Sequence, residues 1–182
     1  MSDATPITLI EAITQALAYE MKHDDAVVVL GEDVGVYGGV FRATDGLLPA
    51  FGADRVLDTP LAEASIAGVS IGLAAQGFRP VAEIQFSGFA YVCIDQLLNH
   101  AGRLRHRTQG RLHCPMVLRT PCGAGIHPPE HHSESPEGMF AHIPGIRVVY
   151  PSSPQRAYGL LLAAIRDVCG TTSPLRPAEH RL

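Results

Sequence analysis

A short apolar run at 26–30, Ala-Val-Val-Val-Leu, constrains the fold more than any other part of the sequence. The run is continuous rather than alternating and rich in β-branched residues, which is typical of a strand buried on both faces. Strands of this kind belong to parallel sheets that helices cover on both sides. Helically spaced apolar residues precede the run at 9–23, and a glycine-rich segment follows it at 31–39. We therefore expect a strand of a parallel sheet here.

The same alternation of helical and strand-like segments continues along the chain. Helices are expected at 9–23, 62–76, 89–107 and 158–166. Strands are expected at 26–30, 56–57, 79–84, 116–118 and 147–149. Because the two kinds of segment alternate, we predict an α/β fold, a three-layer sandwich in which a mostly parallel sheet lies between helices.

Two of the expected helices carry local start signals. Thr8 and Glu11 have the spacing of a capping box, in which each residue satisfies a free backbone amide of the other. Thr59 and Pro60 have the types that favour the N-cap and first-turn positions of a helix. We therefore expect Thr59 to cap the second helix.

The expected helix at 62–76 is almost free of charge. Glu63 is its one charged residue, and Gly68 and Gly72 lie one turn apart. A nearly all-apolar helix is buried, either in the core or against a partner. The two glycines would let one face of this helix approach another backbone closely.

The composition of the 182-residue chain indicates a folded protein and gives no reason to expect a polyanionic partner. Hydrophobic residues make up 46% and charged residues 18%, which suits a single domain with a full core. The net charge is -4, and the arginines clustered at 103–111 have no aromatic residues among them. We interpret that cluster as a solvated helix end and expect no nucleic-acid partner.

The cysteines and the terminal sequence favour a cytoplasmic location. The four cysteines have no C-x-x-C spacing, so we do not expect a zinc site or a redox pair. We expect the cysteines to be reduced thiols. No apolar run is long enough to span a bilayer, and the first residues lack the charged and apolar regions of a signal peptide. We expect no membrane partner.

The character of the sequence changes near its end. Residues 1–167 read as one domain, whereas 168–182 show no periodicity and contain two prolines. We expect this tail to be frayed or loosely packed, without regular structure.

Glu63 has two possible roles when it is considered alone. A carboxylate in the first turn of a helix gains about 0.3–1 kcal/mol from the helix dipole, which is the simpler interpretation. Against it stands the uncharged helix that follows, where a single carboxylate risks burial and would need a functional reason. The pattern alone leaves both open.

The loop at 123–132 is dense in groups that can bind metal or exchange protons. Pro128 and Pro129 prevent a helix between His127 and His131, so a zincin-like face cannot form. A functional loop beside an active site is the better interpretation. The glycine-rich loop at 35–39 lacks both common phosphate-binding motifs.

Three aromatic residues follow one of the expected strands: Phe86, Phe89 and Tyr91. Large aromatic side chains are commonly buried in cores. We expect two of the three to be core residues.

An ordered set of motifs carries a family resemblance. The set consists of Gly-Glu-Asp-Val-Gly at 31–35, Gly-Gly-Val-Phe-Arg at 38–42, Asp-Thr-Pro at 58–60, Gly-Phe-Arg-Pro-Val at 77–81, Glu-Ile-Gln-Phe at 83–86, Asp-Gln at 95–96, His-Ser-Glu-Ser at 132–135 and Pro-Ser-Ser-Pro at 151–154. From about Thr8 to Asp167 the chain resembles the beta subunit of the decarboxylase component of 2-oxo acid dehydrogenase complexes. Pyruvate, branched-chain and acetoin dehydrogenases belong to that group.

The resemblance implies the pyrimidine domain of the thiamin diphosphate-binding fold, in an α2β2 assembly that binds thiamine diphosphate between alpha and beta subunits. The alpha subunit would hold the diphosphate and its magnesium ion. Glu63 matches the family's cofactor-activating glutamate, and Phe89 matches an aromatic residue near the pyrimidine ring. His132 matches a histidine beside the 2-oxo acid substrate that assists acyl transfer to the lipoyl domain of the acyltransferase component.

The resemblance also implies a structural potassium ion. Its ligands, mostly backbone oxygens, match four positions: Met116, Ala164, Ile165 and Asp167. The next ligand position carries Cys169, which is a poor oxygen donor.

The sequence departs from the family pattern at three places. Gly88 stands where the family often has aspartate, and Glu134 stands where it often has glutamine. The resemblance ends at Asp167, where family members continue into a C-terminal domain that is absent here. A shifted reading frame or a shortened chain is the expected cause.

Two other functions remain open at this stage. The first is a truncated, catalytically silent subunit that at most binds the alpha partner. The second is a fragment of another thiamine enzyme, such as a transketolase or deoxyxylulose phosphate synthase. Those enzymes share the glutamate-bearing helix but lack the sequence context at 31–35 and 41–42.

Overall fold

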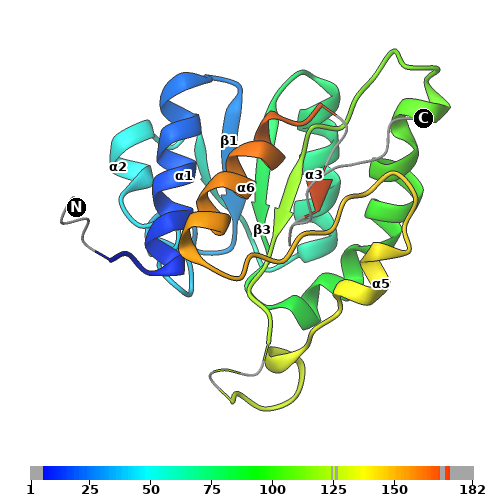
Figure 1. Cartoon of the computed structure of the whole chain (residues 1–182). Coiled ribbons are helices and arrows are strands. Elements are labelled where there is room, and N and C mark those ends of the chain that lie inside the picture. Colours follow the sequence, from blue (N-terminus) through cyan, green and yellow to red (C-terminus); the bar gives the residue numbers. More distant parts are fainter. Residues whose placement is uncertain (1–5, 124, 126, 169–170, 173–182) are drawn as a thin grey trace.

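The computed structural model describes residues 6–123, 125, 127–168 and 171–172, and it contains a five-stranded sheet between two layers of helices (Figure 1). The strands are β1 Val27–Gly31, β2 Val56–Asp58, β3 Arg79–Glu83, β4 Val117–Arg119 and β5 Thr171–Thr172. Their order is β2-β1-β3-β4-β5, and every neighbouring pair is parallel. The predicted three-layer α/β architecture is confirmed.

Consecutive residues of the central strands point into two different cores, as period-two strand geometry requires. One cross-strand row faces helices α1 (Leu9–His23) and α6 (Pro154–Arg166), and it consists of Val29, Val81 and Val117. The adjacent row faces helix α3 (Glu63–Ala75), and it consists of Leu30, Ala82 and Leu118. Both faces of the sheet are therefore buried, which explains the continuous apolar run at 26–30.

The capping box predicted for the first helix is present. The Glu11 carboxylate accepts the Thr8 amide at 2.7 Å, and the Thr8 hydroxyl accepts the Glu11 amide at 3.2 Å. Helix α1 then spans the predicted 9–23.

The predicted cap of α3 is wrong. The helix begins at Glu63, with Ala62 at the N-cap position and no side-chain cap. Thr59 instead donates its amide to the Gly31 carbonyl at 2.9 Å, which extends the pairing of β2 with β1 beyond the strands. The Thr59 hydroxyl is buried without a hydrogen-bond partner in the described part of the chain.

The segment expected as one helix at 89–107 is helical but irregular. It comprises the 3₁₀ turns η1 (Ser87–Cys93), the π-helical η2 (Gln96–His100), a second 3₁₀ turn at Ala101–Arg103 and a short α4 (Leu104–Arg107). A distant loop lies against the break, since a Cβ on Gly102 would lie 2.6 Å from the Pro144 carbonyl oxygen. Local insertions of this kind interrupt regular α-helical bonding.

Two expectations near the C-terminal end need correction. The strand expected at 147–149 is absent, and only Arg147 forms an isolated bridge. Helix α6 starts at Pro154 rather than at Tyr158, because the Ser153 hydroxyl accepts the Arg156 amide at 3.3 Å and Pro154 suits the first turn.

The segment after Asp167 was expected to lack regular structure, but the structure places β5 within it. Thr171 and Thr172 pair with Val117 and Leu118 of β4. The expectation for 173–182 and the position of Cys169 lie outside the described residues. In the described ranges no helix is long and apolar enough to cross a membrane.

Candidate active site

The sequence motifs converge at the carboxyl ends of the parallel strands. The chain leaves β1 into Glu32, β2 into Thr59 and β3 into Ile84, and all these strands point the same way. In open α/β sheets this edge is the usual place for a ligand. The candidate site is therefore built from loops that a rigid sheet holds together.

Glu63 is the first residue of α3 and is half-buried. Its carbonyl accepts the Cys93 thiol of η1 at 3.3 Å, so α3 and η1 are joined at this point. Burial raises the pKa of Cys93 to about 12, and the negative charge of Glu63 acts in the same direction. No side chain in the described part of the chain donates a hydrogen bond to the Glu63 carboxylate, which leaves it available to a ligand.

A second carboxylate lies near Glu63. Glu32 is only 8% exposed, and its pKa is raised first by burial and then by the charges of Glu63 and Asp33. Placing like charges together in a partly buried site disfavours full ionisation. Glu32 therefore holds its proton more strongly than an exposed glutamate does.

Asp58 fixes the glycine-rich loop against the segment that leads to Glu63. Its carboxylate accepts the amides of Gly35 at 2.6 Å and Val36 at 3.0 Å. A Cβ on Gly35 would lie 2.8 Å from the same carboxylate, so only glycine allows this approach. The two motifs at 31–35 and 58–60 are thus joined by one side chain.

An aromatic cluster surrounds His132, which lies on the 3₁₀ turn η4 (Glu130–Ser133). The centroid of the His132 ring lies 4.5 Å from that of Phe86 and 5.1 Å from that of Phe89, and both pairs pack edge to face. The ring of Phe41 packs against that of Phe86, with 5.6 Å between the two centroids. A cavity of about 140 Å³ opens beside this cluster, and Phe41, Phe86 and His132 form part of its wall.

A buried ion pair lies at the ends of β3 and β4. Glu83 is 2% exposed and pairs with Arg119, whose side chain is 12% exposed. Burial lowers the pKa of Arg119 to about 10, so the guanidinium is still charged at neutral pH. A Cβ on Gly39 would lie 2.9 Å from a Glu83 carboxylate oxygen, so the pair also supports the glycine-rich loop.

Residues 5–175 match the family model described as transketolase, pyrimidine binding domain. The chain belongs to this family. The match continues past Asp167, where the sequence resemblance was expected to end, and it includes β5.

Curated relatives point to one kind of family member. The chain is 55% identical over 161 residues to the pyruvate dehydrogenase E1 component subunit beta of Bacillus subtilis, covering 88% of the chain and 50% of the relative. It is 53% identical to the protein of the same name from Acholeplasma laidlawii, covering 88% and 49%. The chain spans about half the length of the curated relatives it matches.

Solved structures confirm the fold of this pyrimidine-binding domain. A split gene transketolase, described as an inactive beta4 tetramer, superposes with a TM-score of 0.69 at 18% identity over 91% of the chain and 50% of that structure. The transketolase from Leishmania mexicana superposes with a TM-score of 0.70 at 16% identity, over 94% and 25%. At these identities the likeness shows the fold.

The domain brings some of the predicted site residues together. Phe89 and His132 are in ring contact, and Glu63 is joined to the same helical segment as Phe89 through Cys93. Their assigned roles remain predictions.

Sequence reasoning missed three members of this arrangement. Phe86 was one of three aromatics of which two were expected in the core, and neither Phe41 nor Glu32 was singled out. Phe41 and Glu32 do lie within the motifs at 38–42 and 31–35, which was the available signal.

The predicted potassium positions lie near the amino ends of the strands, opposite the candidate site at the carboxyl ends. Met116 directly precedes β4, whereas Ala164, Ile165 and Asp167 lie at the end of α6. Arg79 donates to the Ile165 carbonyl at 2.9 Å, and Arg147 pairs with the Asp167 carboxylate. Guanidinium groups thus already bind two of these ligands, and the potassium site stays a prediction. Within the described ranges, no three His, Cys, Asp or Glu side chains group as a metal site.

Proposed function

We propose that this domain forms the pyrimidine half of a thiamine diphosphate site in the beta subunit of a 2-oxo acid dehydrogenase. The observation that carries the proposal is the Glu63 carboxylate, which lies at the ligand-binding edge of the sheet without a donor in the described residues. The names of the curated relatives support pyruvate as the first substrate to test.

The donor set fits the cofactor. Glu63 offers a carboxylate without a donor in the described residues for a pyrimidine nitrogen, and Phe89 offers an aromatic ring on η1, the segment that contacts the start of α3. The loop at 35–39 lacks a phosphate-binding motif, which agrees with an alpha subunit that holds the diphosphate and magnesium. When bound, thiamine diphosphate supplies a carbanion for attack on a keto carbon and accepts electrons as carbon dioxide leaves.

Glu63 would act as the acid–base group of the cofactor. Its carboxyl would form a hydrogen bond to a pyrimidine nitrogen and exchange a proton with it. Burial, and then the charge of Glu63, raise the pKa of the neighbouring Glu32, so a second carboxyl beside Glu63 favours its protonated form.

His132 would serve the second half of the reaction. In acyl transfer the lipoyl disulfide accepts two electrons. One sulfur bonds to the acyl carbon, and the other takes a proton. The His132 ring is held edge-on by Phe86 and Phe89 beside an open cavity, where it can supply that proton.

The exposed face of α3 supports an alpha-subunit partner. Leu61, just before the helix, is 78% exposed, and Val69 is 55% exposed. A Cβ on Gly72 would have no neighbour within 4 Å, so this face is not covered by the described chain. An uncharged apolar helix face beside a catalytic carboxylate is suited to a subunit interface.

The test compares Glu63→Gln with Asp54→Asn. Asp54 is exposed and has no described partner, so it matches the loss of charge without touching the site. The chain is co-expressed with an alpha subunit, and the purified pair is assayed for thiamine-dependent decarboxylation of several 2-oxo acids. We expect Glu63→Gln to lower the rate by about 10²–10⁴-fold, the usual range for an acid–base group, and Asp54→Asn to leave it unchanged.

Full activity in Glu63→Gln would refute the role of the glutamate. If the two chains neither co-purify nor decarboxylate any substrate, the catalytically silent function is favoured instead. Circular dichroism of each variant separates loss of chemistry from loss of fold.

A further inference from the structure

The loop that carries His132 closes on itself. The Gly123 amide donates to the Glu134 carbonyl at 3.2 Å, so the chain returns to the point where it left, as in an Ω-loop. Within it, His127 and Glu130 adopt positive φ angles of 48° and 51°. Each such residue costs about 1–2 kcal/mol. Within the loop, the Ser133 hydroxyl donates to the Pro128 carbonyl at 2.8 Å, and Nδ1 of His132 lies 3.2 Å from the Pro129 carbonyl oxygen. Contacts from outside the loop add to these bonds.

Helix η1 supplies those contacts at Glu134. The Ser87 hydroxyl donates to the Glu134 carbonyl at 2.6 Å, and the Tyr91 hydroxyl donates to the Glu134 carboxylate at 3.1 Å. Burial raises the pKa of Tyr91, and the bond to Glu134 acts in the same direction. The hydroxyl therefore remains a donor at neutral pH.

Gly88 lets the loop approach η1 this closely. A Cβ at this position would overlap the His131 carbonyl oxygen and would lie 3.0 Å from Cγ of Glu134. In this chain a Cβ at position 88 cannot be added without a shift, because the backbones meet, whereas the φ angle of Gly88 is unremarkable. Any side chain at position 88 must push the His132 turn outward.

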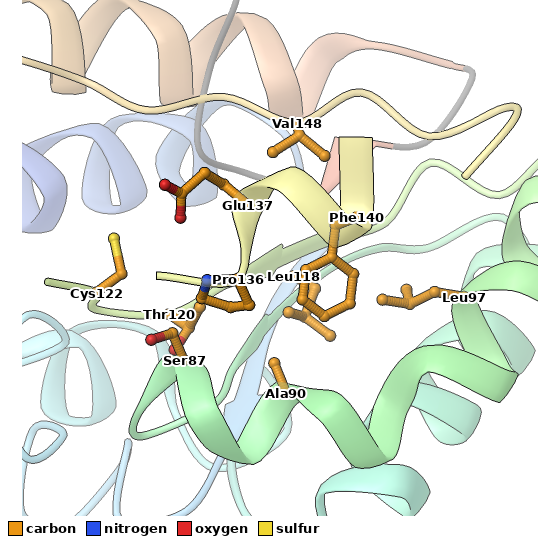
Figure 2. Close-up of a pocket in the computed structure, with 10 residues that line it drawn as sticks. All are labelled: Ser87, Ala90, Leu97, Leu118, Thr120, Cys122, Pro136, Glu137, Phe140 and Val148. Atoms are coloured by element: carbon orange, nitrogen blue, oxygen red, sulfur yellow. The ribbon is translucent and has the colours of Figure 1, made fainter. Parts of the chain in front are cut away.

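The packing of η1 continues past the end of this loop, against the segment that leads into the next helix. A cavity of about 20 Å³ lies between η1 and α5 (Glu137–Ala141). Figure 2 shows the residues that line it, among them Ala90 of η1 and Phe140 of α5. Pro136, at the N-cap of α5, and Ser87 also line it. The void is about the size of one water, so the return of the loop is packed against η1 with little space to shift.

The same short helix carries Phe89, whose ring lies 5.1 Å from that of His132. One rigid element thus determines both where the cofactor-side aromatic lies and where the histidine turn rests. We propose that Gly88, Tyr91 and Glu134 are positioning residues that set the location of His132 relative to Phe89. This inference rests on the proposed function for the claim that the position of His132 matters to acyl transfer.

The first test reads the position directly and requires no activity. The 182-residue chain is labelled with ¹³C-histidine, and the His132 resonance is assigned with His132→Gln. The edge-to-face contacts with Phe86 and Phe89 shift that resonance from the position of an exposed histidine. Gly88→Ala is expected to move it toward the exposed position. Gly138→Ala is the matched control, since an added Cβ there meets nothing within 4 Å.

The second test separates the two halves of the reaction in the complex with an alpha subunit. Gly88→Ala is expected to lower acyl transfer to a lipoyl domain by about 10²-fold, as a displacement near 1 Å can. Decarboxylation with an artificial electron acceptor should stay within a factor of about two, since Glu63 is untouched. His132→Ala should lower acyl transfer more than decarboxylation.

Milder variants keep the proposal testable if Gly88→Ala does not fold. Tyr91→Phe removes one hydroxyl and should lower transfer by about fivefold, the effect of one hydrogen bond. Glu134→Gln keeps an oxygen that can accept the Tyr91 hydroxyl, whereas Glu134→Leu does not. The rate of acyl transfer should therefore be higher in Glu134→Gln than in Glu134→Leu.

An unmoved His132 resonance, or equal loss of both half-reactions in all these variants, overturns the proposal. Failure of the proposed function looks different, because Glu63→Gln would then match the unaltered chain. In that case the resonance alone decides whether these residues position His132.

Discussion

The buried ion pair between Glu83 and Arg119 permits a quantitative prediction. Substituting methionine for Glu83 or for Arg119 removes one charge and leaves the other buried without its partner. The Glu83 side chain is 2% exposed and that of Arg119 is 12%, so water cannot replace the missing partner. Breaking such a pair costs about 3–5 kcal/mol. With a urea m-value of about 2 kcal/mol per molar, the unfolding midpoint should fall by about 1.5–2.5 M.

The double variant Glu83→Met/Arg119→Met is expected to behave differently from either single one. Replacing both charges with apolar groups of similar volume removes the desolvation cost along with the attraction. Its unfolding free energy should lie within about 1–2 kcal/mol of the unaltered chain, so the two single effects will be strongly non-additive. Urea titrations of the full chain followed by circular dichroism give all four corners of the cycle.

The exposed pair of Arg42 and Asp45 is the matched control. Its side chains are 62% and 58% exposed at a separation of 3.0 Å, so Asp45→Asn should cost about 0–1 kcal/mol. The reasoning is refuted if Glu83→Met costs no more than this control, because solvent would then reach Arg119. Additive single effects in the cycle would refute it as well.

Two further predictions concern helix capping and pH. Thr8→Ala removes the cap of α1 and should lower the unfolding free energy by about 1 kcal/mol, measured by urea titration; an unchanged midpoint would mean that the box contributes nothing. Burial and the charge of Glu63 raise the pKa of Glu32 above its usual 4.5, so the folded chain holds this proton more strongly than the unfolded chain. Glu32 should therefore reduce stability progressively as the pH rises through and above 4.5. Glu32→Gln should be increasingly more stable than the unaltered chain over that range, and parallel pH curves would contradict this.

The elements that sequence predicted well are those set by local chemistry. The run at 26–30 reads as a doubly buried strand because both of its faces are apolar, and the two rows of the sheet confirm it. The capping box of Thr8 and Glu11 needs only residues three apart. Glu63 was noticed because no other charge lies on its helix.

The elements that sequence predicted poorly depend on contacts from far along the chain. Thr59 looked like a cap, but pairing with Gly31 keeps it in the sheet. The helix expected at 89–107 is interrupted where Pro144 approaches Gly102. No pattern within 147–149 reveals that the sheet edge beside β4 is taken by Thr171–Thr172 instead.

The partners of the carboxylates separate structural groups from candidate catalytic ones. Asp58 accepts two amides, Glu83 pairs with Arg119, and Glu134 accepts from Tyr91. Each of these three joins two segments of the site and has its hydrogen bonds satisfied by the chain itself.

Glu63 and Glu32 form the contrasting case. Both lie at the ligand-binding edge, and neither carboxylate has a hydrogen-bond donor among the described residues. Leaving partly buried carboxylates without donors is unfavourable unless a ligand or a proton satisfies them. The satisfied carboxylates hold the loops in place, and a rigid surrounding of this kind is what the proposed cofactor role of the unsatisfied Glu63 requires.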